Sequence, residues 1–185
     1  MNESDLLKRI KSNPEEFSVL FRLYYKPIFG YILRRSGNFD EAADIASETF
    51  FKAFRYINRF SYKGISVKIW LYRIATNEIN LYARQTKRHN SLFERFLDDE
   101  MEKFSNYLED DRREYETELQ KHGQYLRVLK ELKTLPAKYQ EVISLKYFEG
   151  KDNMEICEIL SVKEGTLKSL LSRGIEKLRK NCNPL

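Results

Sequence analysis

The sequence predicts an all-α protein in which two small helical domains are joined by an acidic linker. Only 7 Gly and 4 Pro occur among 185 residues, so few positions interrupt a helix. Hydrophobic residues make up 42% of the chain, and in several segments they recur three and four positions apart, which is the spacing of one helix face. Charge is unevenly distributed along the chain, and this distribution separates the domains.

The charge pattern divides the chain into three parts. Residues 1–91 hold 16 basic and 9 acidic side chains, a net charge of +7. Residues 92–120 hold 4 basic and 11 acidic side chains (net −7), and residues 121–185 hold 13 and 8 (net +5). The predicted boundaries are an N-terminal domain at 1–90, a linker at 91–124 and a C-terminal domain at 125–185.

The first predicted helix begins at about Asn13. Asn13 is a favourable N-cap, Pro14 suits the first turn, and Gly37 is expected to end the helix in a left-handed conformation. The residues expected to face the core are Phe17, Leu20, Phe21, Tyr24, Ile28 and Tyr31 or Ile32.

A second helix is predicted from about Asp40 toward Phe60. Its buried side is expected to hold Ala43, Ala46, Phe50, Ala53, Phe54 and Ile57. Another side carries a second stripe at the same spacing, made of Glu41, Asp44, Glu48, Phe51 and Arg55. An acidic stripe that includes a phenylalanine suits protein docking better than nucleic-acid binding, and the alternative is an ordinary solvated face.

A loop and a long helix follow, over residues 59–88. The residues expected to pack inward are Val67, Trp70, Leu71, Ile74 and Leu81. Another side of the helix carries four hydrogen-bonding side chains, Arg73, Asn77, Asn80 and Arg84. In the loop, Phe60, Tyr62 and Lys63 offer rings and a cation that suit an unpaired base, although an exposed polar face is a common alternative.

The last third of the chain predicts a helix-turn-helix. The first helix covers about Asn153 to Leu160, and its expected buried residues are Met154, Ile156, Cys157, Ile159 and Leu160. After a short turn at 161–163, the second helix is expected to bury Leu167, Leu170, Leu171, Gly174, Ile175 and Leu178. Its cations lie outside that stripe, so the helix suits the major groove of DNA, and the alternative is an amphipathic pair with a solvated basic face.

The sequence shows no pattern of residues that is typical of an enzyme active site or of a metal site. No catalytic constellation, metal-ligand spacing or cofactor motif occurs, so we expect no catalytic residue, no metal and no cofactor. Cys157, Cys182, His89 and His122 are isolated from one another. No apolar run reaches the roughly 18 residues of a membrane span and the N-terminus is too polar for a secretory signal, so we expect a cytoplasmic protein without direct membrane insertion.

Four motifs in order resemble the bacterial sigma factors of RNA polymerase, and more narrowly the extracytoplasmic-function group of the sigma-70 family. They are DEAADIASETFFKAF, RFSYKGISVKIWLYRIATNEINLYARQTKR, LKTLPAKYQEVISLKYFEG and EGTLKSLLSRGIEKLRK. The resemblance covers about residues 13–88 and 130–180. It implies a sigma region 2 domain and a sigma region 4 helix-turn-helix domain, and a non-enzymatic initiation factor that directs core polymerase to promoters.

The resemblance also implies a role for each surface. The residues that would bind the coiled coil of the largest polymerase subunit are Glu41, Asp44, Glu48, Phe51 and Arg55. Those that would recognise the minus-ten element, with one nontemplate base flipped out, are Tyr62, Lys63, Gly64, Arg73, Asn77, Asn80 and Arg84. Those that would contact the minus-thirty-five element are Thr166, Lys168, Ser169, Ser172 and Arg173. An anti-sigma factor that covers these faces is a further implied partner.

Four positions depart from the family pattern, and one other function stays open. Leu170 stands where a basic residue is common, and Ser47 stands where glutamine is usual. Ser161 stands where a turn glycine is common, and Gly174 stands where alanine is usual. The alternative function is an autonomous helix-turn-helix regulator whose N-terminal domain dimerises or senses an effector. Such a regulator binds a palindrome by itself, whereas a sigma factor needs core polymerase for specific binding.

Overall fold

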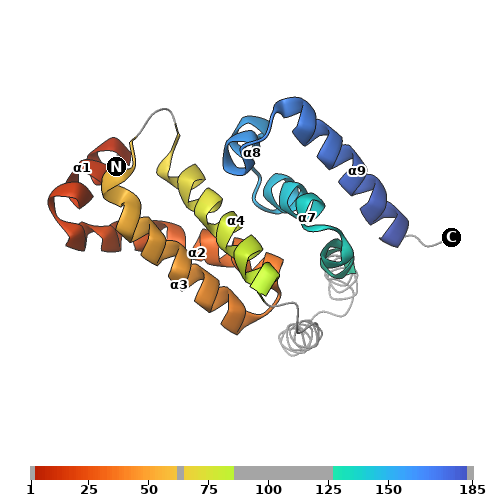
Figure 1. Ribbon diagram of the computed structural model, residues 1–185, viewed down its shortest axis with the longest axis horizontal. Helices are drawn as coiled ribbons and strands as arrows, with labels where there is room; N and C mark the ends of the chain where they lie inside the picture. Colours follow the sequence, from red (N-terminus) through yellow and green to blue (C-terminus); the bar gives the residue numbers. More distant parts are fainter. Residues whose placement is uncertain (1–2, 62–64, 86–126, 183–185) are drawn as a thin grey trace, which may run out of the picture.

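The computed structural model describes residues 3–61, 65–85 and 127–182, and the regular elements in these ranges are all helical, as predicted. The N-terminal half contains α1 (Glu3–Ser12), α2 (Phe17–Ser36), α3 (Phe39–Tyr56) and α4 (Val67–Gln85). The C-terminal half contains α7 (Ala137–Ile143), α8 (Asn153–Leu160) and α9 (Glu164–Cys182). Figure 1 shows the two halves side by side. The predicted linker, 91–124, lies outside the described residues.

Helix α1 is absent from the sequence prediction. It buries Leu6, Leu7 and Ile10. Its Glu3 carboxylate accepts hydrogen bonds from the Tyr24 hydroxyl (2.9 Å) and from the Val67 backbone N–H (3.2 Å). Lys11 Nζ donates to the Phe60 carbonyl (2.8 Å). Since Phe60 lies just after α3 and Val67 begins α4, α1 holds both ends of the segment that joins these two helices.

The two predicted capping residues, Asn13 and Gly37, are confirmed, and the structure adds a cap at Asn38. The Asn13 side chain accepts from the Glu15 N–H (3.1 Å) and starts a 3-10 turn, η1 (Pro14–Glu16), that leads into α2. Gly37 ends α2 with φ at 71°, a left-handed conformation that glycine adopts without steric cost. Asn38 then caps α3 by accepting from the Glu41 N–H (2.9 Å). A second 3-10 turn, η2 (Ile57–Arg59), follows α3.

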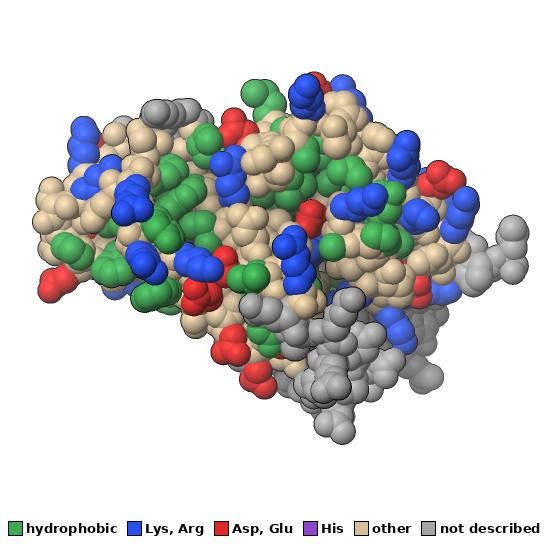
Figure 2. Space-filling view, viewed as in Figure 1, with side chains coloured by type: hydrophobic (Ala, Val, Ile, Leu, Met, Phe, Trp, Pro, Cys, Tyr) green, Lys and Arg blue, Asp and Glu red, His purple; other side chains and the backbone are tan. Residues whose placement is uncertain are grey.

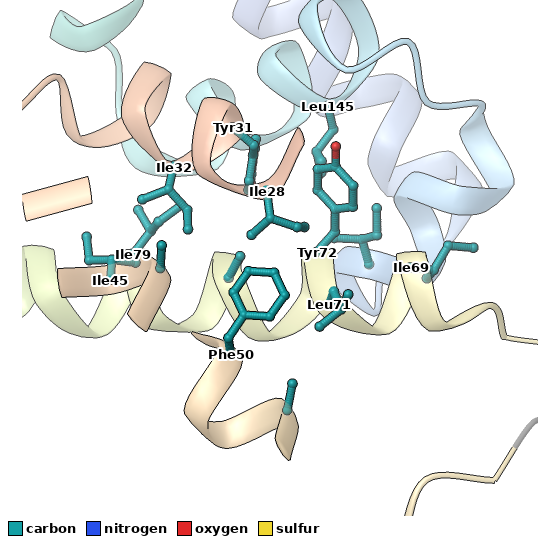
Figure 3. Packing of buried hydrophobic residues seen from close by; sticks show 14 of the residues in the cluster. Ile28, Tyr31, Ile32, Ile45, Phe50, Ile69, Leu71, Tyr72, Ile79 and Leu145 are labelled. Carbon is teal, nitrogen blue, oxygen red and sulfur yellow. The ribbon is translucent and has the colours of Figure 1, made fainter. Parts of the chain in front are cut away.

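The core of the N-terminal half lies between α2, α3 and α4. Its fully buried residues include Leu20, Ile28, Tyr31, Ile32, Ala46, Leu71 and Ala75 (Figure 3). The Tyr31 hydroxyl is hydrogen-bonded to Thr76 Oγ1 (3.0 Å), and Thr76 in turn donates to the Tyr72 carbonyl (2.8 Å). These two hydroxyls therefore have partners, as burial away from water requires.

Four residues predicted to be buried are largely exposed. Phe21 (38%), Phe54 (46%) and Leu81 (42%) lie at the edges of their apolar stripes. The Phe21 ring contacts Phe50 with one side and water with the other, because the stripe is wider than the surface that covers it. Met154 is 78% exposed on α8, whose buried residues are Ile156 and Ile159. Other predicted core residues are only half-buried: Tyr24, Ala43, Trp70, Ile74, Cys157, Leu160, Leu170, Leu171, Ile175 and Leu178.

The C-terminal half has the predicted helix-turn-helix. Residues 127–134 are helical, and a π-helical turn, η3 (Ser144–Phe148), extends α7. Asp152 and Glu155 form a capping box at the start of α8, and Ser161 ends that helix in the left-handed region at φ 55°. A Cβ on Gly174 would lie 3.1 Å from Ile143 Cδ1, so the glycine lets α7 and α9 approach closely.

The two halves pack against each other. Helix α4 contacts α8, and α2 contacts η3. Buried residues of both halves form one apolar cluster, and Figure 3 shows the Tyr72 ring of α4 directed toward the segment that carries Leu145. None of the helices in the described ranges has the length and apolar character of a membrane span.

Candidate functional site

The outer face of α3 presents the predicted acidic stripe to solvent. Asp44, Glu48, Phe51 and Arg55 are exposed, Phe51 to 58%, and Glu41 is half-buried. A cleft of about 330 Å³ lies beside them, between α3 and α4, with walls that include Asp44, Glu48 and Glu78. Lys52 donates to Glu78 (2.6 Å), and this hydrogen bond raises the pKa of Lys52. An exposed ring beside several carboxylates suits a partner with apolar and basic groups.

A second cleft, of about 310 Å³, lies at the N-terminal end of α4. Its walls are made of Tyr56, Arg59, Phe60, Ser61, Ile65, Trp70 and Arg73. The Phe60 and Trp70 rings are 4.6 Å apart between centroids at an interplanar angle of 30°, and the Arg59 guanidinium lies 6.0 Å from the Tyr56 ring centroid. Aromatic rings combined with cations are the groups that bind an unstacked base.

The structure does not describe the predicted capturing loop. Tyr62, Lys63 and Gly64 lie outside the described residues, whereas Ser61 and Ile65 on either side of them line the cleft. Sequence reasoning missed Tyr56 and Arg59 and interpreted Trp70 as core. A signal was available, because Tyr56, Arg59 and Phe60 recur at helical spacing immediately before the loop.

The polar stripe of α4 is only partly open. Asn77 and Arg84 are exposed. Arg73 donates through Nε (3.1 Å) and Nη2 to the Glu158 carbonyl of α8, and Asn80 Nδ2 donates to Glu141 Oε1 of α7 (2.8 Å). Two of the four predicted side chains are thus hydrogen-bonded to the C-terminal half.

The predicted contacts of the helix-turn-helix lie on the first turns of α9. Thr166, Lys168, Ser172 and Arg173 are exposed, and Ser169 is half-buried. Lys168 forms an ion pair with Glu164 (2.7 Å) whose hydrogen bond raises the pKa of Lys168. Figure 2 shows Lys and Arg side chains over the surface that α8 and α9 form. A basic helix surface of this kind suits phosphate and base contacts.

Comparison with known families identifies both halves. The model of Sigma-70 region 2 matches residues 20–89, and the model of Sigma-70, region 4 matches residues 125–178. The ECF RNA polymerase sigma factor SigW of Bacillus subtilis (strain 168) is 33% identical over 185 residues, which cover 97% of this chain and 96% of SigW. The chain belongs to the extracytoplasmic-function group of the sigma-70 family.

Other sigma factors agree with this assignment. The ECF RNA polymerase sigma-E factor of Haemophilus influenzae is 28% identical over 193 residues, which cover 100% of this chain and 97% of that protein. The sigma factor RpoE from Bartonella quintana, solved in complex with the anti-sigma factor NepR, has the same fold, with a TM-score of 0.62 and 21% identity over 90% of this chain and 96% of RpoE. CnrH, solved with the cytosolic domain of CnrY, also matches with a TM-score of 0.62 and 19% identity over 96% of this chain and 94% of CnrH. Sigma factors are transcription initiation factors, and this sigma factor shares their two promoter-directing regions.

Within the described part of this sigma factor, no cluster of three His, Cys, Asp or Glu side chains has a geometry that would hold a metal ion. Its two cysteines, Cys157 and Cys182, are both free thiols, and burial raises the pKa of Cys157.

Proposed function

We propose that this sigma factor binds core RNA polymerase through the outer face of α3 and holds promoter DNA at two separate surfaces. The minus-ten surface is the cleft beside Trp70 with the polar stripe of α4, and the minus-thirty-five surface is the start of α9. The observation that supports the proposal best is the exposed stripe around Phe51, next to an acid-lined cleft. The protein acts stoichiometrically in the cytoplasm, where polymerase and chromosome meet, and polymerase performs the chemistry.

The minus-ten cleft explains how this protein would help to open DNA. Unpairing and extruding one base costs a few kcal/mol, and stacking on an aromatic surface returns about 1–3 kcal/mol per base. The Phe60 and Trp70 rings, 4.6 Å apart and tilted by 30°, together with Arg59 would supply stacking and phosphate contacts at one place. Capture of a flipped base then stabilises the opened promoter.

The decisive experiment tests polymerase binding. The double variant Asp44→Lys with Glu48→Lys should lose binding to core polymerase, because it reverses the charge of the α3 face while both positions stay solvated. The matched control is Asp5→Lys with Glu15→Lys, which makes the same change in net charge at exposed positions on other elements. Retained binding by the first variant, with unchanged helix content, would place the polymerase interface elsewhere.

A second assay separates a sigma factor from an autonomous regulator. In vitro transcription with core polymerase on a pool of random promoters should select DNA with two separated elements. A regulator would instead bind a palindrome without polymerase. An anti-sigma protein is a further proposed partner, and the anti-sigma complexes of the similar sigma factors RpoE and CnrH support it. Such a protein would compete with core polymerase for the α3 face.

A further inference from the structure

A buried carboxylate joins the two halves of the molecule. Glu149 follows η3, and its side chain is only 5% exposed. It accepts hydrogen bonds from Arg34 of α2 and, at 2.7 Å, from the hydroxyl of Tyr72 of α4. Burial, followed by the charge of Glu149, raises the pKa of Tyr72, so this hydroxyl stays protonated and donates. We refer to Glu149, Arg34 and Tyr72 as the Glu149 latch.

Further bonds cross the same interface. Arg35 Nη1 donates to the Ala137 carbonyl (3.3 Å), and Arg35 lies 3.8 Å from the Glu141 carboxylate. The Lys133 ammonium donates to the Ser36 carbonyl (2.6 Å). These bonds place the start of the C-terminal half against the end of α2, while the Glu149 latch fastens η3 over α4.

This packing covers part of the surface assigned to the minus-ten element. Arg73 donates its hydrogen bonds to α8 and Asn80 donates to α7. The C-terminal half and DNA cannot both occupy this face of α4 at the same time. From these contacts we infer that the free protein is closed by its own region 4 domain, and that the Glu149 latch must open before α4 can bind promoter DNA. This inhibition rests on the proposed minus-ten role of α4.

The chemistry of the interface makes it reversible. Removing one partner of a buried ion pair strongly destabilises the packed form, because the other charge is left buried and unpaired. When both partners return to water together, hydration compensates most of the loss, so a polar contact between domains separates at modest cost. Binding of α4 by DNA, which only the open form permits, then shifts the population toward the open form.

Small-angle scattering on the free full-length chain tests the closed state. The wild type should be compact, with a radius of gyration near the roughly 16 Å expected for a single globule of this length. Glu149→Lys should raise that radius, because it opposes a cation to Arg34. Glu176→Lys changes net charge equally at an exposed pair on α9 and should not. Arg34→Glu breaks the same ion pair from its N-terminal side and should also raise the radius. The double variant Arg34→Glu with Glu149→Lys restores opposite charges and should return the radius to the wild-type value.

A binding assay tests the inhibition. The probe is the nontemplate minus-ten strand of a promoter selected by in vitro transcription, and Glu149→Lys should bind it about tenfold more tightly than Glu176→Lys. Circular dichroism would show that the variants keep their helices. An unchanged radius in both single variants overturns the latch, and a larger radius with unchanged strand affinity overturns the inhibition. Failure of every variant to bind core polymerase would count against the proposed function instead, because scattering needs neither polymerase nor DNA.

Discussion

Closure of the two halves should depend on pH through Lys133. Its half-buried side chain lies between the halves, where the ammonium contacts the Ser36 carbonyl and faces Glu41 and Arg35. Burial lowers the pKa of Lys133 to about 7, against an ordinary value of 10.5. The closed form therefore binds fewer protons than the open form between these two values. Closure is weakest below pH 7, where both forms carry the charge, and it strengthens as pH rises.

The expected size follows from these two pKa values. Linkage for one lysine strengthens closure about 50-fold between pH 7 and pH 9. Raising the pH strengthens closure through Lys151 as well. The Lys151 ammonium lies 4.3 Å from the Tyr72 ring centroid, and its pKa is lowered first by burial and then by Lys68. Glu149 and Glu155 also face Lys151 and oppose this shift.

The assay measures affinity for the nontemplate minus-ten strand at constant ionic strength from pH 6 to pH 9. Only the open form binds, so the apparent dissociation constant of the wild type should rise with pH by the same factor as closure. Lys133→Met removes the titrating group and should flatten most of this rise, which controls for titration elsewhere. Equal pH slopes for the wild type and Lys133→Met would refute the reasoning.

Three further substitutions test single features. Arg173→Ala should weaken promoter binding by about 1–3 kcal/mol at fixed salt if Arg173 reads a base, whereas Arg179→Ala, in the last turn of α9, should have a smaller effect. Ser161→Gly should stabilise the chain by about 0.5–1 kcal/mol in urea titration, because glycine relieves a left-handed backbone, and a lower midpoint would contradict this. Asp152→Ala removes the capping box of α8 and should cost about 1 kcal/mol by the same measurement.

Periodicity and capping residues were enough to predict most helices. Asn13 and Gly37 mark helix ends by local chemistry, and local chemistry acts the same way in any tertiary context. Helix α1 escaped prediction because its apolar residues, Leu6, Leu7 and Ile10, form too short a stripe to distinguish a helix from a polar tail.

The interior of each stripe was predicted better than its edges. Phe21 and Phe54 carry the same hydrophobic signal as Leu20 and Phe50, yet only the neighbouring helix decides which of them it covers. The Glu149 latch was beyond sequence reasoning for a related reason. Glu149 and Arg34 are 115 positions apart, and no local pattern reports a contact between elements so distant in the chain.

Helix α1 contacts both ends of the segment that joins α3 to α4. Lys11 holds the Phe60 carbonyl and Glu3 holds the Val67 backbone N–H, on the two sides of that segment. The N-terminal helix therefore helps to position Phe60, which lines the cleft proposed to receive a flipped base.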